Sequence, residues 1–164
     1  MLFSATAAFR RVTDISPLFL KSKKIKGLIL DLDNTLTTHD NPKPADGVLD
    51  WIDLMRQNNI KLMIVSNNHS PRVKPFADML GLDFVCEGKK PLSKGFREAA
   101  AKMQLSFNEL AAVGDQIYTD VLGANLAGLK CLYVVPIEHE KTPFFKFKRK
   151  MEIPFLPKNI TKSK

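Results

Sequence analysis

The sequence predicts an α/β fold, a doubly wound and mainly parallel sheet of five strands with helices on both faces. Short apolar runs alternate with segments of helical periodicity from about residue 26 onward, which is typical of parallel strands joined by crossover helices. Polar residues directly follow several of these runs, at the edge where open α/β sheets form their binding crevice. With 164 residues, of which 45% are hydrophobic, the chain can form one such domain with a real core.

The expected strands and helices alternate along the chain. Strands are expected at residues 27–30, 61–65, 84–86, 111–113 and 131–135. Helices are expected at 48–58, from 70 to 81, at 91–104 and at 120–127. Gly81 and Gly128 mark two of the helix ends, and Ser106 to Glu109 fits a capping box before the fourth strand.

The composition restricts the partners and the location. A net charge of +8 favours anionic partners such as phosphate esters, nucleic acid or acidic lipid headgroups. No apolar run approaches the roughly 18 residues that a membrane helix needs, and Cys86 and Cys131 fit reduced core positions. Residues 1–12 do not fit a secretory signal, because their arginines follow the apolar part; a transit peptide stays open. We expect a cytoplasmic protein, free or peripheral on the inner membrane face, or a mitochondrial matrix protein in a eukaryote.

Polar side chains from several segments should meet at the carboxyl edge of the sheet. Asp31 and Asp33 follow the first predicted strand directly. Ser66 follows the second strand, and Asp115 follows the fourth. Because the carboxyl ends of parallel strands share one edge, these groups are candidates for a single site.

The two carboxylates after the first strand suit phosphoryl transfer. Asp31 can attack phosphorus, because a carboxylate is already ionised at neutral pH and needs no separate base. Asp33 can protonate the leaving alkoxide and later deprotonate the hydrolytic water. The alternative for this Asp-x-Asp pattern is a turn or a cap at the strand end.

Other residues could supply the metal site and bind the phosphate. Asp115 offers an oxygen ligand of the kind that Mg²⁺ prefers. Asp120 either supports that site or begins the next helix, where its charge suits the helix dipole. Ser66 could bind phosphoryl oxygens together with Asn67, although this stretch also fits a turn. Of three nearby lysines, Lys89, Lys90 and Lys94, we favour Lys90, because the proline after it should begin the helix.

Together these motifs resemble the haloacid dehalogenase phosphatase superfamily, in order and at fitting separations. The resemblance rests on the Asp-Leu-Asp-Asn-Thr-Leu stretch at 31–36, Ser66, Lys90-Pro91, and the Gly-Asp-x-x-x-x-Asp stretch at 114–120. It implies Asp31 as nucleophile, Asp33 as general acid and base, Ser66, Asn67 and Lys90 as phosphate binders, Asp31, Asp33 and Asp115 as Mg²⁺ ligands, and Asp120 and Thr35 as supporting residues. No catalytic group of the family is missing, which argues against a non-catalytic binding module.

The spacing of the motifs and the sequence around them narrow the resemblance to one subfamily. The intervals from Asp33 to Ser66 and from Ser66 to Lys90 leave no room for a cap domain, so the active site should be open. Residues of about 12–140 resemble the capless subfamily IIIA and its mitochondrial-type phosphatidylglycerophosphatases. This implies the anionic phospholipid phosphatidylglycerophosphate as substrate, a step toward cardiolipin. A soluble or nucleic-acid-end phosphate ester is the alternative, with nucleic acid the less favoured.

We expect one domain at residues 1–142. The segments at its two ends are expected to lie outside the catalytic machinery. Residues 1–24 are an N-terminal extension that packs on the domain or on membrane. Residues 143–164 interleave aromatic and basic residues, as a membrane-binding tail would. Alternatively, this tail packs its phenylalanines on the sheet and solvates its lysines, or it binds single-stranded nucleic acid. The loop at 138–140 is expected to be solvated, and the oligomeric state is left open.

Overall fold

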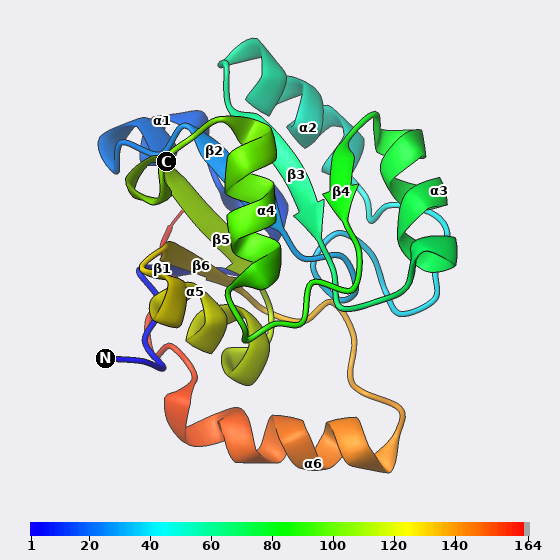
Figure 1. The fold of residues 1–164 in the computed structure, drawn as a ribbon. Helices are drawn as coiled ribbons and strands as arrows, with labels where there is room; N and C mark the ends of the chain where they lie inside the picture. Colours follow the sequence, from blue (N-terminus) through cyan, green and yellow to red (C-terminus); the bar gives the residue numbers. More distant parts are fainter. Residues whose placement is uncertain (163–164) are drawn as a thin grey trace.

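A single parallel sheet organises the molecule. The computed structural model describes residues 1–162, and its six strands lie in the order β1-β6-β5-β2-β3-β4, all pairs parallel (Figure 1). The strands are β1 (Ala7–Phe9), β2 (Gly27–Leu30), β3 (Lys61–Val65), β4 (Asp83–Val85), β5 (Leu110–Gly114) and β6 (Lys130–Val134). The chain winds outward from β2 through β3 to β4, then returns to β5 on the other side of β2. The predicted doubly wound α/β fold is therefore confirmed.

Helices cover both faces of this sheet, and one helix stands apart. The helices are α1 (Pro17–Ser22), α2 (Val48–Gln57), α3 (Ser70–Leu80), α4 (Lys94–Met103), α5 (Leu122–Ala127) and α6 (Pro143–Glu152). Buried side chains of α1, α2 and α3 form one core with the sheet, whereas those of α4 and α5 form the other. Helix α6 supplies no residue to either core and runs along the bottom in Figure 1, below the carboxyl ends of the strands. Within residues 1–162 no helix is long and apolar enough to cross a bilayer.

The central strand fixes the position of the site. All four residues of β2 are buried, as expected for a strand with helices on both faces. Leu30 lies opposite Val113 of β5, and the N–H of Asp31 continues the ladder by donating to the Val113 carbonyl at 2.9 Å. The residues that follow β2 and β5 therefore emerge side by side at the point where the winding changes direction, where such sheets bind ligands.

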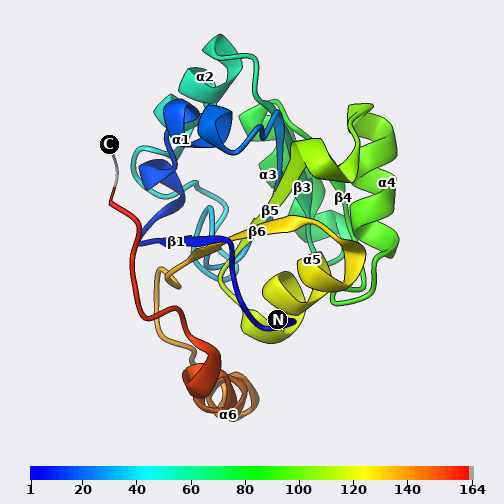
Figure 2. The same cartoon turned by 90° about the vertical axis from the view of Figure 1, so that its left-hand side faces the viewer.

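The sheet has one strand more than predicted. Strand β1 lies in the region expected as an N-terminal extension, and Ala7 to Phe9 pair with Leu132 to Val134 of β6. A strand of three residues is too short to show the alternation that identifies a strand in a sequence. The backbone of Thr161 also reaches this strand, since its N–H donates to the Ala8 carbonyl at 2.6 Å. The segment after α6 thus passes beside the edge strand β1, as Figure 2 shows.

Trp51 joins α2 to the segment before α1 and gives a test of this packing. Its indole Nε1 donates to the carbonyl of Ile15 at 2.8 Å, and only 4% of the residue is exposed. We expect Trp51→Phe to lower the free energy of unfolding by about 1–3 kcal/mol, because the buried carbonyl loses its donor. Urea denaturation measures this change. Leu54→Ala, at an exposed position of the same helix, is the control, and equal losses in both variants would contradict the prediction.

Candidate active site

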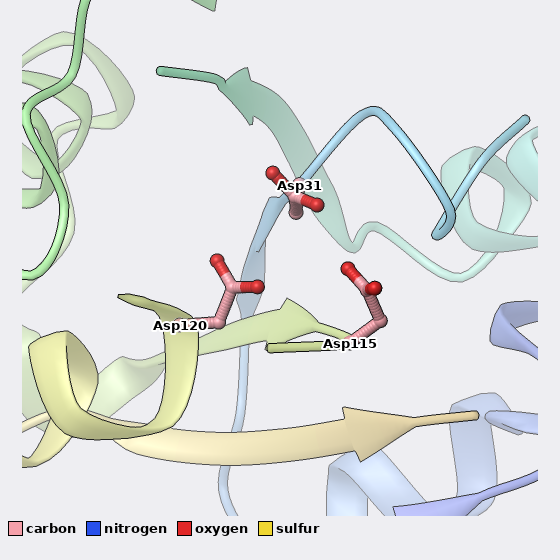
Figure 3. Close-up of side chains that lie close together, drawn as sticks. All are labelled: Asp31, Asp115 and Asp120. Atoms are coloured by element: carbon pink, nitrogen blue, oxygen red, sulfur yellow. The ribbon is translucent and has the colours of Figure 1, made fainter. Parts of the chain in front are cut away.

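Three buried carboxylates face one another at the carboxyl edge of the sheet. Asp31 follows β2, Asp115 follows β5, and Asp120 lies on the π-helical turn η3 (Ile117–Val121) before α5. One oxygen of each carboxylate lies within 4.8 Å of the others, and Figure 3 shows the three side chains converging. The cluster joins two residues expected at the metal site with one whose role was left open.

Lys90 is the cation at the centre of this cluster. Its Nζ donates to Asp31 Oδ1 and to Asp120 Oδ1, both at 2.7 Å. Lys90 is buried, whereas Lys89 and Lys94 are exposed. Asn67, expected to bind phosphate, uses its side chain to hold this lysine: its Oδ1 accepts from the Lys90 N–H at 2.8 Å and its Nδ2 donates to the Lys90 carbonyl at 3.0 Å.

Thr35 and Gly114 complete the surroundings of the carboxylates. The hydroxyl of Thr35 lies 3.3 Å from Asp31 Oδ2 and 3.4 Å from Asp115 Oδ1, so it touches the side chains that follow two neighbouring strands. Asp120 Oδ2 accepts from the N–H of Gln116 at 3.1 Å, which closes the π-helical turn. A Cβ at Gly114 would overlap the Asp120 carboxylate, so only glycine leaves room for this arrangement.

Asp33 lies beside the cluster and has partners of its own. Its Oδ2 accepts from Asn68 Nδ2 at 2.7 Å, and its Oδ1 accepts from Arg72 Nη2 at 2.8 Å. Ser66 is buried, and its hydroxyl accepts from the N–H of Asn68 at 3.1 Å. Arg72 belongs to α3 and was not predicted as a site residue, because nothing in the sequence around it indicates that α3 faces Asp33.

Arg149 of α6 is the second residue that sequence reasoning missed. Its guanidinium donates to the Asp115 carboxylate, to the Asp115 carbonyl at 2.7 Å and to Glu140 Oε1 at 2.8 Å. A third carboxylate, that of Glu152, accepts from it at 3.2 Å. Glu140 is buried, so the expectation of a solvated loop at 138–140 does not hold for this residue. The loop and α6 fold back onto Asp115, because the positive charge of Arg149 pairs there with the negative charges of Asp115 and Glu140.

Comparisons with known proteins agree with this geometry. Residues 37–128 match the model of a hydrolase family described as haloacid dehalogenase-like hydrolase. The curated protein "Probable phosphatase YqeG" of Bacillus subtilis (strain 168) is 38% identical over 143 residues, which cover 87% of this chain and 83% of that protein. The chain belongs to the haloacid dehalogenase-like hydrolase family. The predicted family is thus confirmed, although the matched segment begins after Asp31 and Asp33.

Solved structures share the fold at low sequence identity. An uncharacterized protein from Listeria monocytogenes serotype 4b superposes with a TM-score of 0.59 at 20% identity, covering 73% of this chain and 85% of that one. The cobalt-bound deoxy-D-mannose-octulosonate 8-phosphate phosphatase (YrbI) from Haemophilus influenzae gives 0.56 at 19% identity, covering 78% and 77%. These likenesses support the sheet and its helices.

Burial and mutual repulsion raise the pKa values of the clustered carboxylates. Burial raises the pKa of Asp31 well above its usual range, the Asp120 charge adds to it, and Lys90 opposes it. The pKa of Asp115 is raised to about 6, chiefly by burial and against the effect of Arg149. Burial alone would lower the pKa of Lys90, but the carboxylates of Asp120 and Asp31 outweigh it and raise the net value.

The donor set of the cluster suits Mg²⁺. It consists of carboxylate oxygens on well-fixed elements, and Mg²⁺ is bound in proteins by one or two carboxylates together with waters and substrate phosphate. Asp31 and Asp115 are the carboxylates that could hold the ion, because both side chains also meet at Thr35. A divalent cation there would favour the ionised carboxylates and so oppose the burial and the repulsion that raise their pKa values.

Substitution of Arg149 tests the charge balance at Asp115. We expect Arg149→Met to lose about 3 kcal/mol of stability in a chelating buffer, because it leaves buried carboxylates without their cation. The same variant should gain more stability from added Mg²⁺ than the parent protein, since its site is more negative. Thermal unfolding with chelator and with Mg²⁺ measures both effects.

Two variants serve as controls for this experiment. Arg149→Lys keeps the charge but loses the forked contacts, so its Mg²⁺ response should lie between those of the other two proteins. Arg97→Met removes an exposed arginine of α4 and should behave like the parent. A Mg²⁺ response equal in all four proteins would show that Arg149 does not influence the carboxylate cluster.

Proposed function

We propose that the protein is a Mg²⁺-dependent phosphomonoesterase that forms an aspartyl-phosphate on Asp31. The observation that carries the proposal is the convergence of Asp31, Lys90 and Asp115 at one end of the sheet, at the distances given above. A phosphatase is also the name given to the Bacillus subtilis relative. A nucleophile, a cation for the phosphoryl oxygens and a metal-binding carboxylate are the parts that phosphoryl transfer needs.

The proposed reaction has two steps. A carboxylate oxygen of Asp31 forms a bond to phosphorus while the bond from phosphorus to the ester oxygen breaks, and Asp33 gives its proton to the departing alkoxide. Water then attacks the same phosphorus, Asp33 takes a proton from it, and phosphate leaves with regeneration of the Asp31 carboxylate. Bound Mg²⁺ would supply positive charge for the phosphoryl oxygens.

The remaining site residues would position these groups. Lys90 lies against Asp31 and can shift its contacts to a phosphoryl oxygen, while Asn67 keeps its backbone in place. The Ser66 hydroxyl accepts one hydrogen bond in the structure and still has its own proton to donate to phosphate. Asp120 would position Lys90 by accepting a hydrogen bond from its Nζ. Arg72 and Asn68 would orient the Asp33 carboxylate by donating to it.

For the substrate, we propose phosphatidylglycerophosphate. Between Asp33 and Ser66 the chain forms a loop, α2 and β3, and between Ser66 and Lys90 it forms α3 and β4, so these fully described intervals hold no cap domain. An open site can accept a phosphate carried on a surface. The cationic residues of α6 beside the site and the resemblance to subfamily IIIA support an anionic lipid.

Substitution of the nucleophile tests the mechanism. We expect Asp31→Asn to lower turnover by about 10³-fold or more, because the amide cannot form the phosphoenzyme. Phosphate release from phosphatidylglycerophosphate in mixed micelles with Mg²⁺ is the measurement. Asp53→Asn, an equally small change at an exposed carboxylate of α2, should keep full activity. Retained turnover in Asp31→Asn would eliminate the covalent route.

The same assay decides the substrate when it includes other esters. A soluble sugar phosphate and a 5′-phosphorylated oligonucleotide are compared with the lipid at equal concentration. A clear preference for either soluble ester would overturn the lipid assignment but leave the phosphatase assignment intact. Absence of turnover with all three, together with an unchanged fold, would favour a binding module.

Gly114 offers a test of the geometry without removing any functional group. Gly114→Ala should push the Asp120 carboxylate away from Lys90 and lower turnover by about a hundredfold, as small displacements in active sites do. Gly128→Ala is the control, because a Cβ there has no atom within 4 Å; its positive φ makes a loss of stability but not of turnover the expected result. Equal activities of the two variants would contradict the proposed role of Asp120.

A further inference from the structure

Helix α6 carries an apolar stripe on its outer, exposed side. Phe144, Phe147 and Met151, at helical spacing of three and four, are 71%, 64% and 50% exposed. The inner side is mixed: Phe145 and Arg149 are partly buried, and Glu152 is 1% exposed. A helix on a globular core normally buries its apolar stripe and exposes its charges. The apolar stripe of α6, by contrast, has no cover within residues 1–162.

Specific contacts hold the helix in this orientation. Arg149 binds the Asp115 carboxylate, as described above. Directly before it in the chain, Lys148 Nζ donates to Gln116 Oε1 at 2.6 Å, and about one turn after it Glu152 Oε1 accepts from the N–H of Tyr118 at 3.2 Å. Rotating the apolar stripe inward would break all of these bonds and leave buried charges unpaired, which costs several kcal/mol. The outward stripe is therefore a fixed feature of the surface.

The charges around the stripe are of one sign. Lys146 and Lys150 are exposed beside it, and the one acidic residue of α6, Glu152, is buried. Exposed apolar residues continue beyond the helix at Ile153 (61%) and Leu156 (38%). An apolar stripe flanked by lysines is complementary to a bilayer surface that carries anionic headgroups.

The exposed apolar residues that follow α6 border a cavity next to Arg149. A cavity of about 730 Å³ lies between α6 and the segment after β6. Ile153 and Leu156 belong both to its lining and to the exposed apolar surface, and Arg149 lines it while contacting Asp115. The cavity thus borders both the exposed apolar residues after α6 and Arg149, whereas no carboxylate of the Asp31, Asp115 and Asp120 cluster lines it.

We propose that the apolar stripe of α6, formed by Phe144, Phe147 and Met151, docks into the surface of an anionic phospholipid bilayer. Lys146 and Lys150 then pair with headgroup phosphates at the rim. Because the inner side of the same helix holds Asp115, docking would bring the carboxylate cluster to about one helix diameter, roughly 10 Å, from the membrane surface on which a lipid substrate carries its phosphate. The link to catalysis rests on the proposed function, whereas the docking itself does not.

Vesicle binding tests the docking surface. The full-length protein is mixed with vesicles of phosphatidylglycerol and phosphatidylcholine, or of phosphatidylcholine alone, and the bound fraction is measured by flotation. We expect preferential binding to the anionic vesicles. The triple variant Phe144→Ser, Phe147→Ser and Met151→Ser should bind them at least about tenfold more weakly. The control is Leu18→Ser, Leu49→Ser and Leu54→Ser, three exposed apolar residues of α1 and α2, which should bind like the parent.

A spectroscopic reporter gives an independent readout. Phe147→Trp places an indole on the stripe, whereas the natural Trp51 is buried in the core. The fluorescence emission of the indole introduced at position 147 should shift to shorter wavelength when anionic vesicles are added. No shift, no preference of the parent for anionic vesicles, or undiminished binding by the triple serine variant would overturn the proposal. Conversion of a dimer into a monomer by the triple variant would also overturn it, because the stripe would then be covered by a second copy of the chain.

Activity assays separate this proposal from the proposed function. The triple serine variant should keep its turnover of a soluble chromogenic phosphate ester and lose turnover of vesicle-borne lipid, since the substituted residues lie outside the carboxylate cluster. Vesicle binding without lipid hydrolysis would remove the proposed substrate and leave the docking surface standing. Lipid hydrolysis without vesicle binding would overturn the docking surface and leave the proposed substrate standing.

Discussion

The ion pairs of Lys90 with Asp31 and Asp120 are the constraint on which the site depends. Charges buried this deeply are tolerated only when they are paired and hydrogen-bonded, so the elements that carry them must meet accurately. Two neighbouring strands supply Asp31 and Asp115, and the chain between β4 and α4 supplies Lys90. Arg149 supplies the second cation from a helix outside both cores. The site is therefore also a junction that fixes the relative positions of the sheet, a loop and α6.

The local backbone serves this junction. An ordinary α-helical start after β5 would carry Asp120 away from the strand end, whereas the wider π-helical turn at Ile117–Val121 brings its carboxylate back over Gly114. Gly114 has no side chain and so makes space for the Asp120 carboxylate. The side-chain amide of Asn67 holds the backbone of Lys90 in place beside it. Electrostatics and close packing thus specify one arrangement together.

The sequence was sufficient where the signal is local. Strands such as β2 and β3 are continuous apolar runs, and Asp31, Ser66 and Asp115 follow their strands at the expected places. Lys90 was preferred to its neighbours because Pro91 was expected to begin the helix. That start is wrong, since α4 begins at Lys94, but Lys90 is the buried lysine of the three. Arg72, Arg149 and β1 were missed because their roles come from contacts with residues far away in the chain. The orientation of α6 could not be predicted either, since its phenylalanines and lysines fit a core-facing or an outward-facing apolar stripe equally well.

The backbone hydrogen bond from the Thr161 N–H to the Ala8 carbonyl gives the C-terminal segment a structural role. Because residues after α6 return to the edge strand β1, the segment is held at both ends and acts as a strap across the carboxyl edge of the sheet. Cutting it away would strip Asp115 of its counter-ion and at the same time open the edge of β1 to pairing with other chains. A shortened protein would thus differ from the parent in charge balance and in self-association, and not only in what its surface can bind.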